Sequence, residues 1–565
     1  MSIDPNKKLA GILLPVFAIR RKGDLGIGDT SAMKEAIDFC SRNKITVLQT
    51  LPINETGGDN SPYNAISAMA LDPVYTDMSP NLVPGLTPAD YEKVKQSTDQ
   101  SLLGAEDVDY QIVKKLKLDL FRAAFKNFKS TKEFENFKKE DGWWLTPYAV
   151  FRSLLDTRSG DTNWTRWPEE LQNFESAKKY LEANGQAQEI EFWSYVQWVA
   201  HEQWLDVRKY ADKHGVRIMG DIPFGVSRYS ADVWQNKKLF DLEMAGGAPP
   251  EPLFFNDLFT KNWGQNWGIP LYDWVEHKKE NFAWWKNRIK RLTAHFHDFR
   301  IDHILGFFRI YAFPWIPERN HEFVELTKEQ AQELTGGKLP GFVPRSDELE
   351  EDAELNHQEG KAILKVIADA ASKSGAFIVA EDLGLVVPDY VRETIHELGM
   401  AGFAIPIFEH IPDSQEFKPV STLHPLSLAT YATHDHQTIA QYYRDLVERW
   451  HGPNGHESWL EMRRLMGLIN LDPDNPPVVY DQKVQYAFEK TLAESPCWLI
   501  VMMISDLLGT QDRFNQPGLS GKGCWSKRLD APLCDLEKDP AFKDKISDFS
   551  KLVEKSGRFQ LVGSK

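Results

Sequence analysis

The sequence predicts an α/β fold, a (β/α)8 TIM barrel with large subdomains inserted in the loops at its C-terminal face. Short apolar runs rich in β-branched residues recur along the chain, and helix-like stretches follow several of them, which is the pattern of βα units around a parallel sheet. Eight such runs are present, and eight strands close a barrel of this kind. The runs are residues 11–19, 45–53, 216–224, 299–304, 377–380, 402–408, 429–433 and 499–504.

Composition gives the third observation. With 565 residues, 42% hydrophobic and 26% charged, the chain has the composition of a globular protein with a large core. Its formal net charge of -16 argues against binding nucleic acid or an anionic membrane and is compatible with a neutral substrate. The 4 cysteines have no CxxC spacing and are too few for a disulfide scaffold. The apolar stretch near the N-terminus is too short to span a membrane, so we expect a cytoplasmic protein.

The first two runs make up the barrel start, residues 1–54, with a helix predicted over residues 31–43 because capping residues precede it. Roughly 160 residues then separate the second run from the third, far more than a usual βα loop. Residues 55–195 are therefore predicted to form an inserted helical, Trp-rich subdomain. A long helix over about residues 190–214 leads back to the barrel.

Residues 196–317 are predicted to hold the third and fourth strands of the barrel. Within them, residues 248–267 follow the third strand and carry several aromatic side chains near Gln265 and Asn266. We expect this loop to lie across the mouth of the cleft. Its aromatic residues are Phe254, Phe255, Trp263 and Trp267.

The rest of the chain alternates between barrel and insertions. Residues 318–358, with paired glycines, prolines and an acidic run, are predicted to form a lid-like insertion. Residues 359–443 hold strands five to seven, with a helix over residues 388–398. Residues 444–486 form a further inserted segment, and residues 487–565 hold the eighth strand and the C-terminal part of the chain.

Acidic residues follow five of the predicted strands. Catalytic groups of parallel barrels lie at the C-terminal ends of the strands. Like charges brought together there raise one another's pKa and destabilise the fold, so such a cluster indicates chemistry or a metal. The acids are Asp221, Asp302, Glu381, Asp382, Asp435 and Asp506.

Three kinds of chemistry use such a cluster. A metal-dependent hydrolase needs histidine-rich ligand sets, but His303 and His434 each stand alone beside an aspartate, which makes a metal a minor option. A Mg²⁺ enzyme for phosphorylated substrates needs a phosphate cradle, and no convincing one is found. Retaining glycosyl transfer needs two carboxyl groups about 5 to 5.5 Å apart, and the 18 Trp supply flat rings for sugar faces. This third chemistry requires no metal and no organic cofactor.

Short motifs occur in order along the chain, and four of them contain strand-end acids named above. They are residues 11–15 (GILLP), 25–29 (LGIGD), 51–53 (LPI), 59–63 (DNSPY), 220–223 (GDIP), 264–268 (GQNWG), 299–303 (FRIDH), 380–384 (AEDLG), 433–435 (THD) and 515–518 (NQPG). With these motifs the sequence resembles the 4-α-glucanotransferases of glycoside hydrolase family 77, also called amylomaltases or disproportionating enzymes. The resemblance covers nearly the whole chain.

The resemblance implies three catalytic residues. Asp302 matches the nucleophile, Glu381 the general acid/base and Asp435 the stabiliser of the transition state. The roles make physical sense, because Arg300 on the same strand face holds a carboxylate ionised, and partial burial keeps Glu381 protonated. Asp435 needs only an electrostatic role.

The resemblance also implies the residues that bind the sugar. They are Ser61, Tyr63, Asp221, Arg300 and His434 around the transferred glucose, and Gln265 and Trp267 on a loop beside the cleft. The implied substrates are maltooligosaccharides, glucose and larger α-1,4-glucans.

The residues leave two other functions open. A hydrolase on the same scaffold differs only in whether water or a sugar hydroxyl takes part in the second step, and aromatic loops that exclude water favour transfer. A non-catalytic glucan-binding protein is the third interpretation. The presence of all three catalytic carboxyl groups argues against it, because binding alone does not need them.

Overall fold

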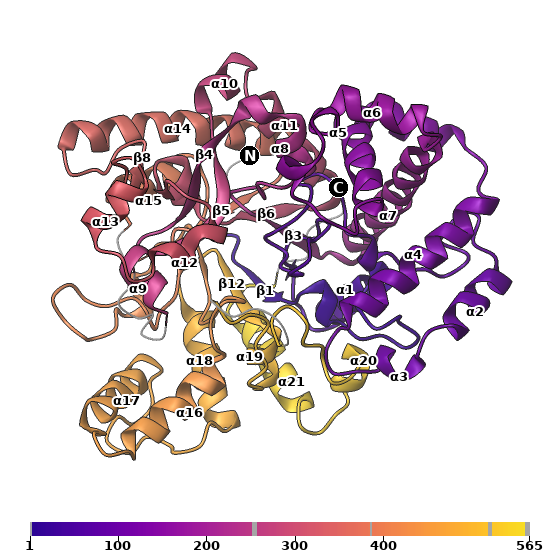
Figure 1. Cartoon of the computed structure of the whole chain (residues 1–565). Helices are drawn as coiled ribbons and strands as arrows, with labels where there is room; N and C mark the ends of the chain where they lie inside the picture. The colour runs from indigo at the N-terminus through magenta and orange to yellow at the C-terminus, as the bar shows by residue number, and fades with distance from the viewer. Residues whose placement is uncertain (1–2, 251–256, 385–386, 518–522, 560–565) are drawn as a thin grey trace.

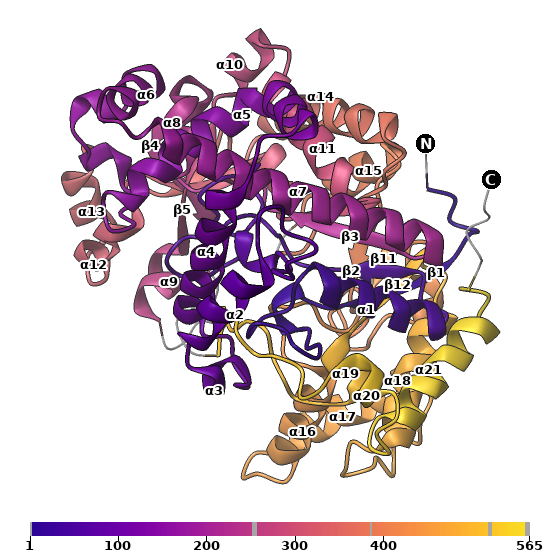
Figure 2. The ribbon, with the colours of Figure 1, turned by 90° about the vertical axis from the view of Figure 1, so that its right-hand side faces the viewer.

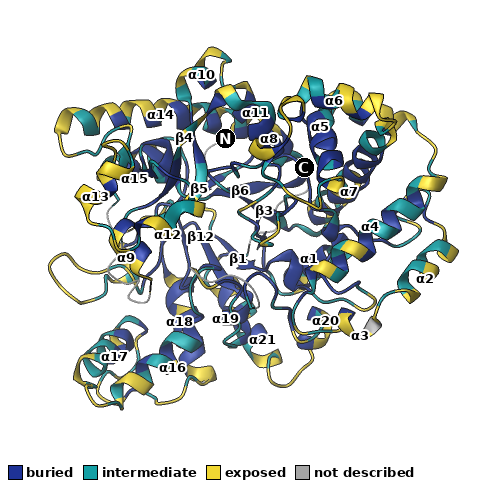
Figure 3. Cartoon of the chain, viewed as in Figure 1, coloured by how far each residue is buried: buried dark blue, intermediate teal, exposed yellow. Residues whose placement is uncertain are grey.

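The computed structural model describes residues 3–250, 257–384, 387–517 and 523–559 of the chain. The parallel strands lie at the centre of the molecule, and helices surround them (Figure 1). Residues at the centre are buried, whereas exposed residues lie on the outward faces of the helices (Figure 3).

Eight parallel strands form the barrel, in the order β10-β11-β12-β1-β2-β3-β6-β9. A parallel bridge between Val379 and Ala401 joins the two ends of this sheet, with a backbone hydrogen bond of 2.7 Å from Ala380 N to Ala401 O. The predicted (β/α)8 barrel is thereby confirmed. The strands are β1 (Leu9–Leu13), β2 (Val47–Gln49), β3 (Arg217–Ile222), β6 (Asp298–Ile301), β9 (Ile378–Ala380), β10 (Gly402–Ala404), β11 (Ser427–Ala429) and β12 (Leu499–Met503).

Each predicted run contains part of a barrel strand, but seven of the eight strands end earlier than predicted, the exception being β9, which ends at Ala380 as expected. The first run was expected to reach residue 19, whereas β1 ends at Leu13 because Pro15 cannot donate to a neighbouring strand and the chain then coils into a 3-10 helix. The seventh was expected over residues 429–433, but β11 ends at Ala429. Residues 430–433 are buried without being part of the strand. An apolar run therefore predicts that its residues are buried, but not that all of them belong to a strand.

Helices on the outside of the barrel begin and end at recognisable signals. Asp29 caps α1 (Thr30–Arg42) by accepting a hydrogen bond of 3.0 Å from Ala32 N. In Figure 2, α7 (Ala187–His214) runs alongside β2 and β3. It ends at Gly215, whose φ of 67° lies in the left-handed region that favours glycine. Further α-helices between β3 and the C-terminal part of the chain are α8 (Ala231–Gln235), α10 (Trp274–Lys279), α11 (Ala283–His295), α14 (Glu350–Lys373), α15 (Asp389–Glu397), α16 (Ile439–Trp450), α17 (His456–Leu468), α18 (Gln482–Glu494), α19 (Ile504–Leu508), α20 (Leu533–Leu536) and α21 (Lys543–Lys555).

The chain between β2 and β3 forms helices that lie on one side of the barrel in Figure 1. Most tryptophans of this region are buried, including Trp144, Trp164 and Trp167, whereas Trp143 is 38% exposed. Their core is continuous with buried residues of β3 and β6, so the region is packed against the barrel. Its helices are α2 (Pro88–Gln96), α3 (Gln100–Leu103), α4 (Tyr110–Asn127), α5 (Lys132–Asp156) and α6 (Phe174–Ala183), followed by α7.

A second, antiparallel sheet was not predicted. Its order is β5-β4-β7-β8, and its strands come from the chain after β3 and after β6. The strands are β4 (Phe240–Ala248), β5 (Gln265–Tyr272), β7 (Ile310–Phe313) and β8 (Gly341–Val343). Of the loop predicted over residues 248–267, the described parts form the end of β4, the helix α9 (Leu258–Trp263) and the start of β5. Phe254 and Phe255 of that loop, and Gly518, lie outside the described residues.

The lid-like insertion predicted over residues 318–358 contains α12 (Asn320–Phe323), α13 (Lys328–Leu334), β8 and the start of α14. A small cluster of buried aromatic side chains attaches it to α9 and β7, including Trp315 stacked on Phe323 with ring centroids 3.7 Å apart. Among the described residues, we find no helix long and apolar enough to cross a membrane.

Candidate active site

Arg300 joins three acidic side chains at the C-terminal ends of neighbouring strands. It lies on β6 directly opposite Asp221 of β3, and its Nη1 donates to both carboxylate oxygens of Asp221 at 3.0 and 2.8 Å. Its Nη2 lies 2.9 Å from Asp302 Oδ1 and 3.9 Å from Glu381 Oε2. Asp302 and Glu381 each come one residue after their strand ends. We call Asp221, Asp302, Glu381 and Asp435, the last described below, the carboxylate cluster.

The two acids nearest Arg300 differ in exposure. The side chain of Asp221 is fully buried, whereas that of Asp302 is 30% exposed. Burial raises the pKa of Asp221 against the opposing effect of Arg300. Asp302 is therefore the carboxylate that combines contact with a guanidinium and exposure to solvent.

Glu381 is the acid best suited to carry a proton. Its Oε2 accepts a 2.7 Å hydrogen bond from His303 N, and its Oε1 accepts one of 3.1 Å from Leu383 N. Burial, which Arg300 opposes and the Asp302 carboxylate reinforces, raises the pKa of Glu381 to about 7. Because one guanidinium nitrogen of Arg300 lies 2.9 Å from Asp302 and 3.9 Å from Glu381, the two carboxyl groups are close neighbours in the site.

His303 and Trp267 form the side of the site next to Glu381. His303 has a φ of 48°, the left-handed conformation, and this turns its N–H toward the Glu381 carboxylate. The ring of Trp267 meets that of His303 edge to face at 4.9 Å and is 39% exposed. Gln265 Oε1 accepts a hydrogen bond of 3.2 Å from Trp267 Nε1. Trp267 therefore offers an accessible ring beside the acid.

Asp435 lies in the loop after β11, where several groups support its ionised form. His434 Nε2 lies 3.2 Å from its Oδ2, and Asn515 Nδ2 donates to its Oδ1 at 2.6 Å. Burial alone would raise the pKa of Asp435, but His434 and Asn515 outweigh it and hold the pKa well below the ordinary value. Arg513 Nη2 donates to the backbone oxygen of Asp435 at 3.0 Å. Asp435 is therefore a fixed negative charge in the cleft.

Tyr63 connects Asp221 with His434, the residue next to Asp435. Its hydroxyl donates to Asp221 Oδ2 at 2.7 Å, and its ring stacks on His434 with centroids 5.2 Å apart and planes 15° apart. Ser61 Oγ accepts a hydrogen bond of 3.3 Å from Tyr63 N. Ser61 thus lies in the turn that holds Tyr63, and the only described contacts of its side chain are within that turn.

Two strand-end acids do not join the cluster, so the expectation that all of them converge was wrong. Asp382 accepts hydrogen bonds from Phe403 N at 2.7 Å and Arg392 Nε at 3.0 Å. Asp506 lies within α19 and accepts from Ile439 N at 2.8 Å. Both carboxyl groups satisfy backbone N–H groups of other elements, β10 for Asp382 and the start of α16 for Asp506, a structural use of strand-end acids.

Three further residues of the site were not singled out from the sequence. Asn515 and Arg513 hold Asp435, and the ring of Trp525 lies 5.8 Å from both Tyr63 and His434. Asn515 begins one of the quoted motifs, so the sequence carried a signal for it. Trp525 stands about 90 residues beyond its nearest ring partner in the sequence, and no spacing indicates the contact.

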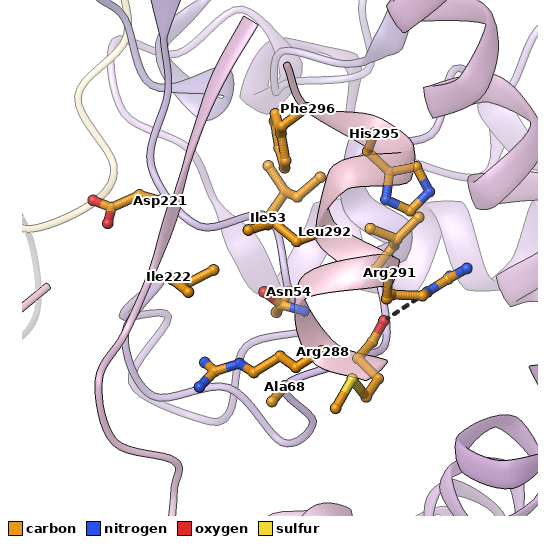
Figure 4. A pocket seen from close by; sticks show the side chains of 12 residues that line it. Ile53, Asn54, Ala68, Asp221, Ile222, Arg288, Arg291, Leu292, His295 and Phe296 are labelled. Carbon is orange, nitrogen blue, oxygen red and sulfur yellow. Dashed lines mark hydrogen bonds between the residues drawn. The ribbon is translucent and has the colours of Figure 1, made fainter. Parts of the chain in front are cut away.

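No group of three or more His, Cys, Asp or Glu side chains within the described part of the chain is arranged to hold a metal ion. A cavity of about 20 Å³ lies between β3 and α11, on the side of β3 away from the Asp221 carboxylate (Figure 4). It has room for about one water molecule. Asp221 is one of the residues that line this cavity, but the carboxylate of Asp221 points away from the other lining side chains in Figure 4.

Comparisons with known proteins agree on one family. A family model described as 4-alpha-glucanotransferase matches residues 14–533. The 4-alpha-glucanotransferase of Chlamydia pneumoniae is 29% identical over 542 residues, which cover 93% of this chain and 92% of that protein. That of Aquifex aeolicus is 28% identical, with 90% of this chain and 93% of that protein covered.

Two solved structures show the same fold. The amylomaltase from Streptococcus agalactiae in complex with acarbose has a TM-score of 0.73 at 20% identity, covering 98% of this chain and all of the other. The amylomaltase from Corynebacterium glutamicum has a TM-score of 0.76 at 19% identity, covering 97% of this chain and 75% of the other.

Proposed function

Because the chain belongs to glycoside hydrolase family 77, the 4-alpha-glucanotransferases, we propose that it acts by two successive displacements at the carboxylate cluster. The activity is that of a 4-alpha-glucanotransferase, which cuts an α-1,4 bond of a donor glucan and joins the released segment to an acceptor. The observation that carries the proposal is the shared contact of Asp302 and Glu381 with Arg300, in which one carboxyl is accessible and the other has its pKa raised to about 7.

In the first displacement an Asp302 oxygen forms a bond to the anomeric carbon of the donor, and the glycosidic C–O bond breaks. Glu381 gives its proton to the departing oxygen, which leaves as the free 4-hydroxyl of the released glucan. The product is a glycosyl ester on Asp302. Arg300 supports this step because its Nη2, 2.9 Å from Asp302 Oδ1, holds the carboxylate in position for attack.

In the second displacement the 4-hydroxyl of an acceptor attacks the anomeric carbon, and the ester bond to Asp302 breaks. Glu381, now ionised, takes the hydroxyl proton and returns to its starting state. Two inversions at the same carbon retain the α configuration. The hydrogen bonds from His303 N and Leu383 N support the ionised form of Glu381 between the steps.

The remaining residues hold and stabilise the transferred glucose. Asp435 supplies a negative charge toward the positively charged transition state, and the low pKa of its carboxyl keeps that charge in place. Arg300 and His434 bind the sugar hydroxyls, and Tyr63 stacks beneath the ring. Asp221, whose side chain is fully buried, holds Arg300 and Tyr63 in place. Ser61 contributes through the turn that carries Tyr63.

In the second displacement, transfer is faster than hydrolysis when an acceptor sugar occupies the site in place of water. The exposed ring of Trp267 beside Glu381, with Gln265 bonded to it, supports an acceptor site at this point. The substrates are maltooligosaccharides, glucose as acceptor and larger α-1,4-glucans, in the cytoplasm. A hydrolase with the same carboxyl groups is the alternative.

Chromatography of a maltotriose digest over time tests the proposal. We expect a ladder of longer maltooligosaccharides together with free glucose, and the same ladder in the presence of a chelator, because the reaction needs only carboxyl groups. Glucose and maltose alone would identify a hydrolase. A requirement for one added ion after chelation would contradict a reaction without a metal.

A further inference from the structure

Three rings form one side of the carboxylate cluster. Tyr63 and His434 are nearly parallel, and Trp525 contacts both, with centroid distances of 5.8 Å and interplanar angles of 50° and 43°. Each of the two partners also contacts an acid, because Tyr63 donates to Asp221 and His434 lies beside Asp435. Trp525 is 7% exposed, and its two ring contacts are with Tyr63 and His434. These two rings connect Trp525 to the cluster.

The backbone of Trp525 is held in an unusual conformation. Its φ of 60° lies in the left-handed region, where a bulky side chain is rare and the backbone is strained. Trp525 N donates to Phe514 O at 2.7 Å, and Trp525 O accepts from the hydroxyl of Tyr110 at 2.7 Å. Hydrogen bonds on both sides of the residue therefore maintain a conformation that the side chain itself disfavours.

Helix α4 of the inserted subdomain contacts both segments that carry these rings. Tyr110 and Lys114, four residues apart on one face of α4, point to different partners. Tyr110 reaches Trp525, whereas Lys114 Nζ donates to Thr56 Oγ1 at 3.1 Å and to Asn60 Oδ1 at 3.2 Å. Thr56 and Asn60 belong to the chain segment that leads to Tyr63.

The segment after Trp525 is tied to the same subdomain. Val108 N donates to Ser526 O at 2.8 Å, and Ser526 Oγ donates to Asp107 Oδ1 at 2.8 Å. Arg528 N donates to Glu106 O at 2.9 Å. The chain just before α4 thus fixes the segment that presents Trp525 to the cleft.

We infer that Trp525 is a positioning residue of the active site, and that the first turns of α4 hold it there so that its ring sets the planes of Tyr63 and His434. This inference rests on the proposed roles of Tyr63 and His434 in binding the transferred glucose. Small errors in the placement of such groups reduce rate strongly, by roughly a hundredfold for about 1 Å. A flat ring at residue 525 is the required property, because it packs against two other rings at once.

Two substitutions of similar size separate positioning from simple packing. Trp525→Phe keeps a flat ring, and Trp525→Leu keeps apolar volume without one. We expect kcat/KM for maltotriose to stay within about threefold of wild type for Trp525→Phe and to fall about 10- to 100-fold for Trp525→Leu. Equal loss in both variants would overturn the inference.

Trp498→Leu is the matched control for loss of a buried tryptophan. Trp498 is 2% exposed and directly precedes β12, at the end of the strand opposite the cleft. We expect it to lower the midpoint of thermal denaturation about as much as Trp525→Leu and to leave kcat/KM unchanged at a temperature where both are folded. If the two variants lose activity in proportion to stability alone, Trp525 has only a packing role.

A double-mutant cycle tests whether Trp525 acts through Tyr63. In a Tyr63→Ala background, Trp525→Leu should reduce kcat/KM by a smaller factor than in the wild-type background, because one of the two rings that it positions is gone and only His434 remains. The same 10- to 100-fold loss in both backgrounds would contradict the inference. The maltotriose ladder of the wild-type enzyme tests the proposed function separately, so the two failures are distinguishable.

The contribution of α4 has its own pair of variants. Tyr110→Phe removes the hydroxyl that donates to Trp525 O, and Tyr195→Phe removes a buried hydroxyl that donates to Pro84 O at 2.7 Å, away from the cluster. We expect similar changes in thermal stability, with a loss of kcat/KM of about three- to tenfold only for Tyr110→Phe. If the two variants have equal kcat/KM, the hydrogen bond from Tyr110 of α4 does not help to position Trp525.

Discussion

At the scale of single residues, exposure separates carboxyl groups that share a guanidinium. Arg300 contacts Asp221 and Asp302 at nearly the same distance, but only Asp302 is accessible. From the sequence, both acids follow apolar runs, and nothing in these runs tells which carboxylate is exposed. Only the family resemblance gave the two acids different roles. The sequence prediction also grouped Asp382 and Asp506 with them, because the partners of a carboxylate depend on backbone N–H groups from other elements.

Replacing Asp302 by Asn should abolish turnover and leave the fold intact. The amide has nearly the same size and can still accept from Arg300, but it cannot form the glycosyl ester, so kcat should fall at least about a thousandfold. Maltotriose turnover and the midpoint of thermal denaturation measure the two effects. The exposed Asp369→Asn serves as control. Residual activity of more than a few per cent would mean that another group is the nucleophile.

The raised pKa of Glu381 predicts the alkaline side of the pH profile. The first displacement needs the protonated carboxyl, so kcat/KM for maltotriose should decline as pH rises through about 7 and should be little affected by this group at lower pH. Replacement by Gln removes the proton donor and should also remove this decline. With a glycosyl fluoride donor, whose leaving group needs little protonation, Glu381→Gln should partly recover the first step and accumulate the ester on Asp302. Equal losses with both donors would place the acid elsewhere.

At the scale of elements, the sequence predicted what is local and missed what pairs over a distance. The barrel strands are recognisable as apolar runs, and the capping residue Asp29 indicates the start of α1. The antiparallel sheet is different, because β4 and β5 are separated by residues 249–264 and β7 and β8 by residues 314–340. No two-residue hairpin turn joins either pair, and such turns are the strongest short-range signal for antiparallel pairing.

Two glycines at helices should respond oppositely to alanine. Gly215 ends α7 with a φ of 67°, and a Cβ there meets no atom within 4 Å, so Gly215→Ala should lose about 1 to 2 kcal/mol through backbone strain alone. Gly467 lies in α17, is exposed and also has open space around a Cβ. Gly467→Ala should stabilise by about 0.5 to 1 kcal/mol. Thermal denaturation of both variants measures the shifts, and a shift of the same sign in both would contradict this argument.

At the scale of the whole molecule, residues far apart in the sequence assemble the site. Tyr63 follows β2, Asp435 follows β11 and Trp525 follows β12, yet they meet at one end of the barrel. The convergence of strand ends follows from the barrel and was predictable once eight runs were recognised. The contact of α4 with the segment around Trp525 was not, because it depends on how an inserted subdomain packs against the end of the chain.

The same assembly buries two acids that serve no role in the proposed reaction. Glu489 of α18 and Asp506 of α19 are each 1% exposed, and burial raises their pKa values to about 8 and about 7. Gln485 connects them, because its Nε2 donates to Glu489 Oε1 at 2.9 Å and to Asp506 O at 3.3 Å. Both carboxyls are therefore protonated in the folded protein over much of the acidic range, whereas an unfolded chain ionises them near pH 4.

The stability of the folded protein should consequently depend on these two protons. Their contribution is fully present below the pKa of the unfolded chain, and it is lost as pH rises through about 7 for Asp506 and about 8 for Glu489. Glu489→Gln keeps a side chain that accepts from Gln485 and carries no proton to lose. Its midpoint of thermal denaturation should match that of wild type near pH 4.5 and exceed it increasingly up to about pH 8, beyond which the gap stays constant. Glu494→Gln, on the exposed side of the same helix, removes an equal charge and should show no such growing gap.

A constant difference between wild type and Glu489→Gln across this range would contradict the argument, because it would mean that Glu489 is already ionised in the folded state. The buried charge of Glu489 would then have to be compensated by the nearby Lys545, whose Nζ donates to Leu508 O at 2.7 Å.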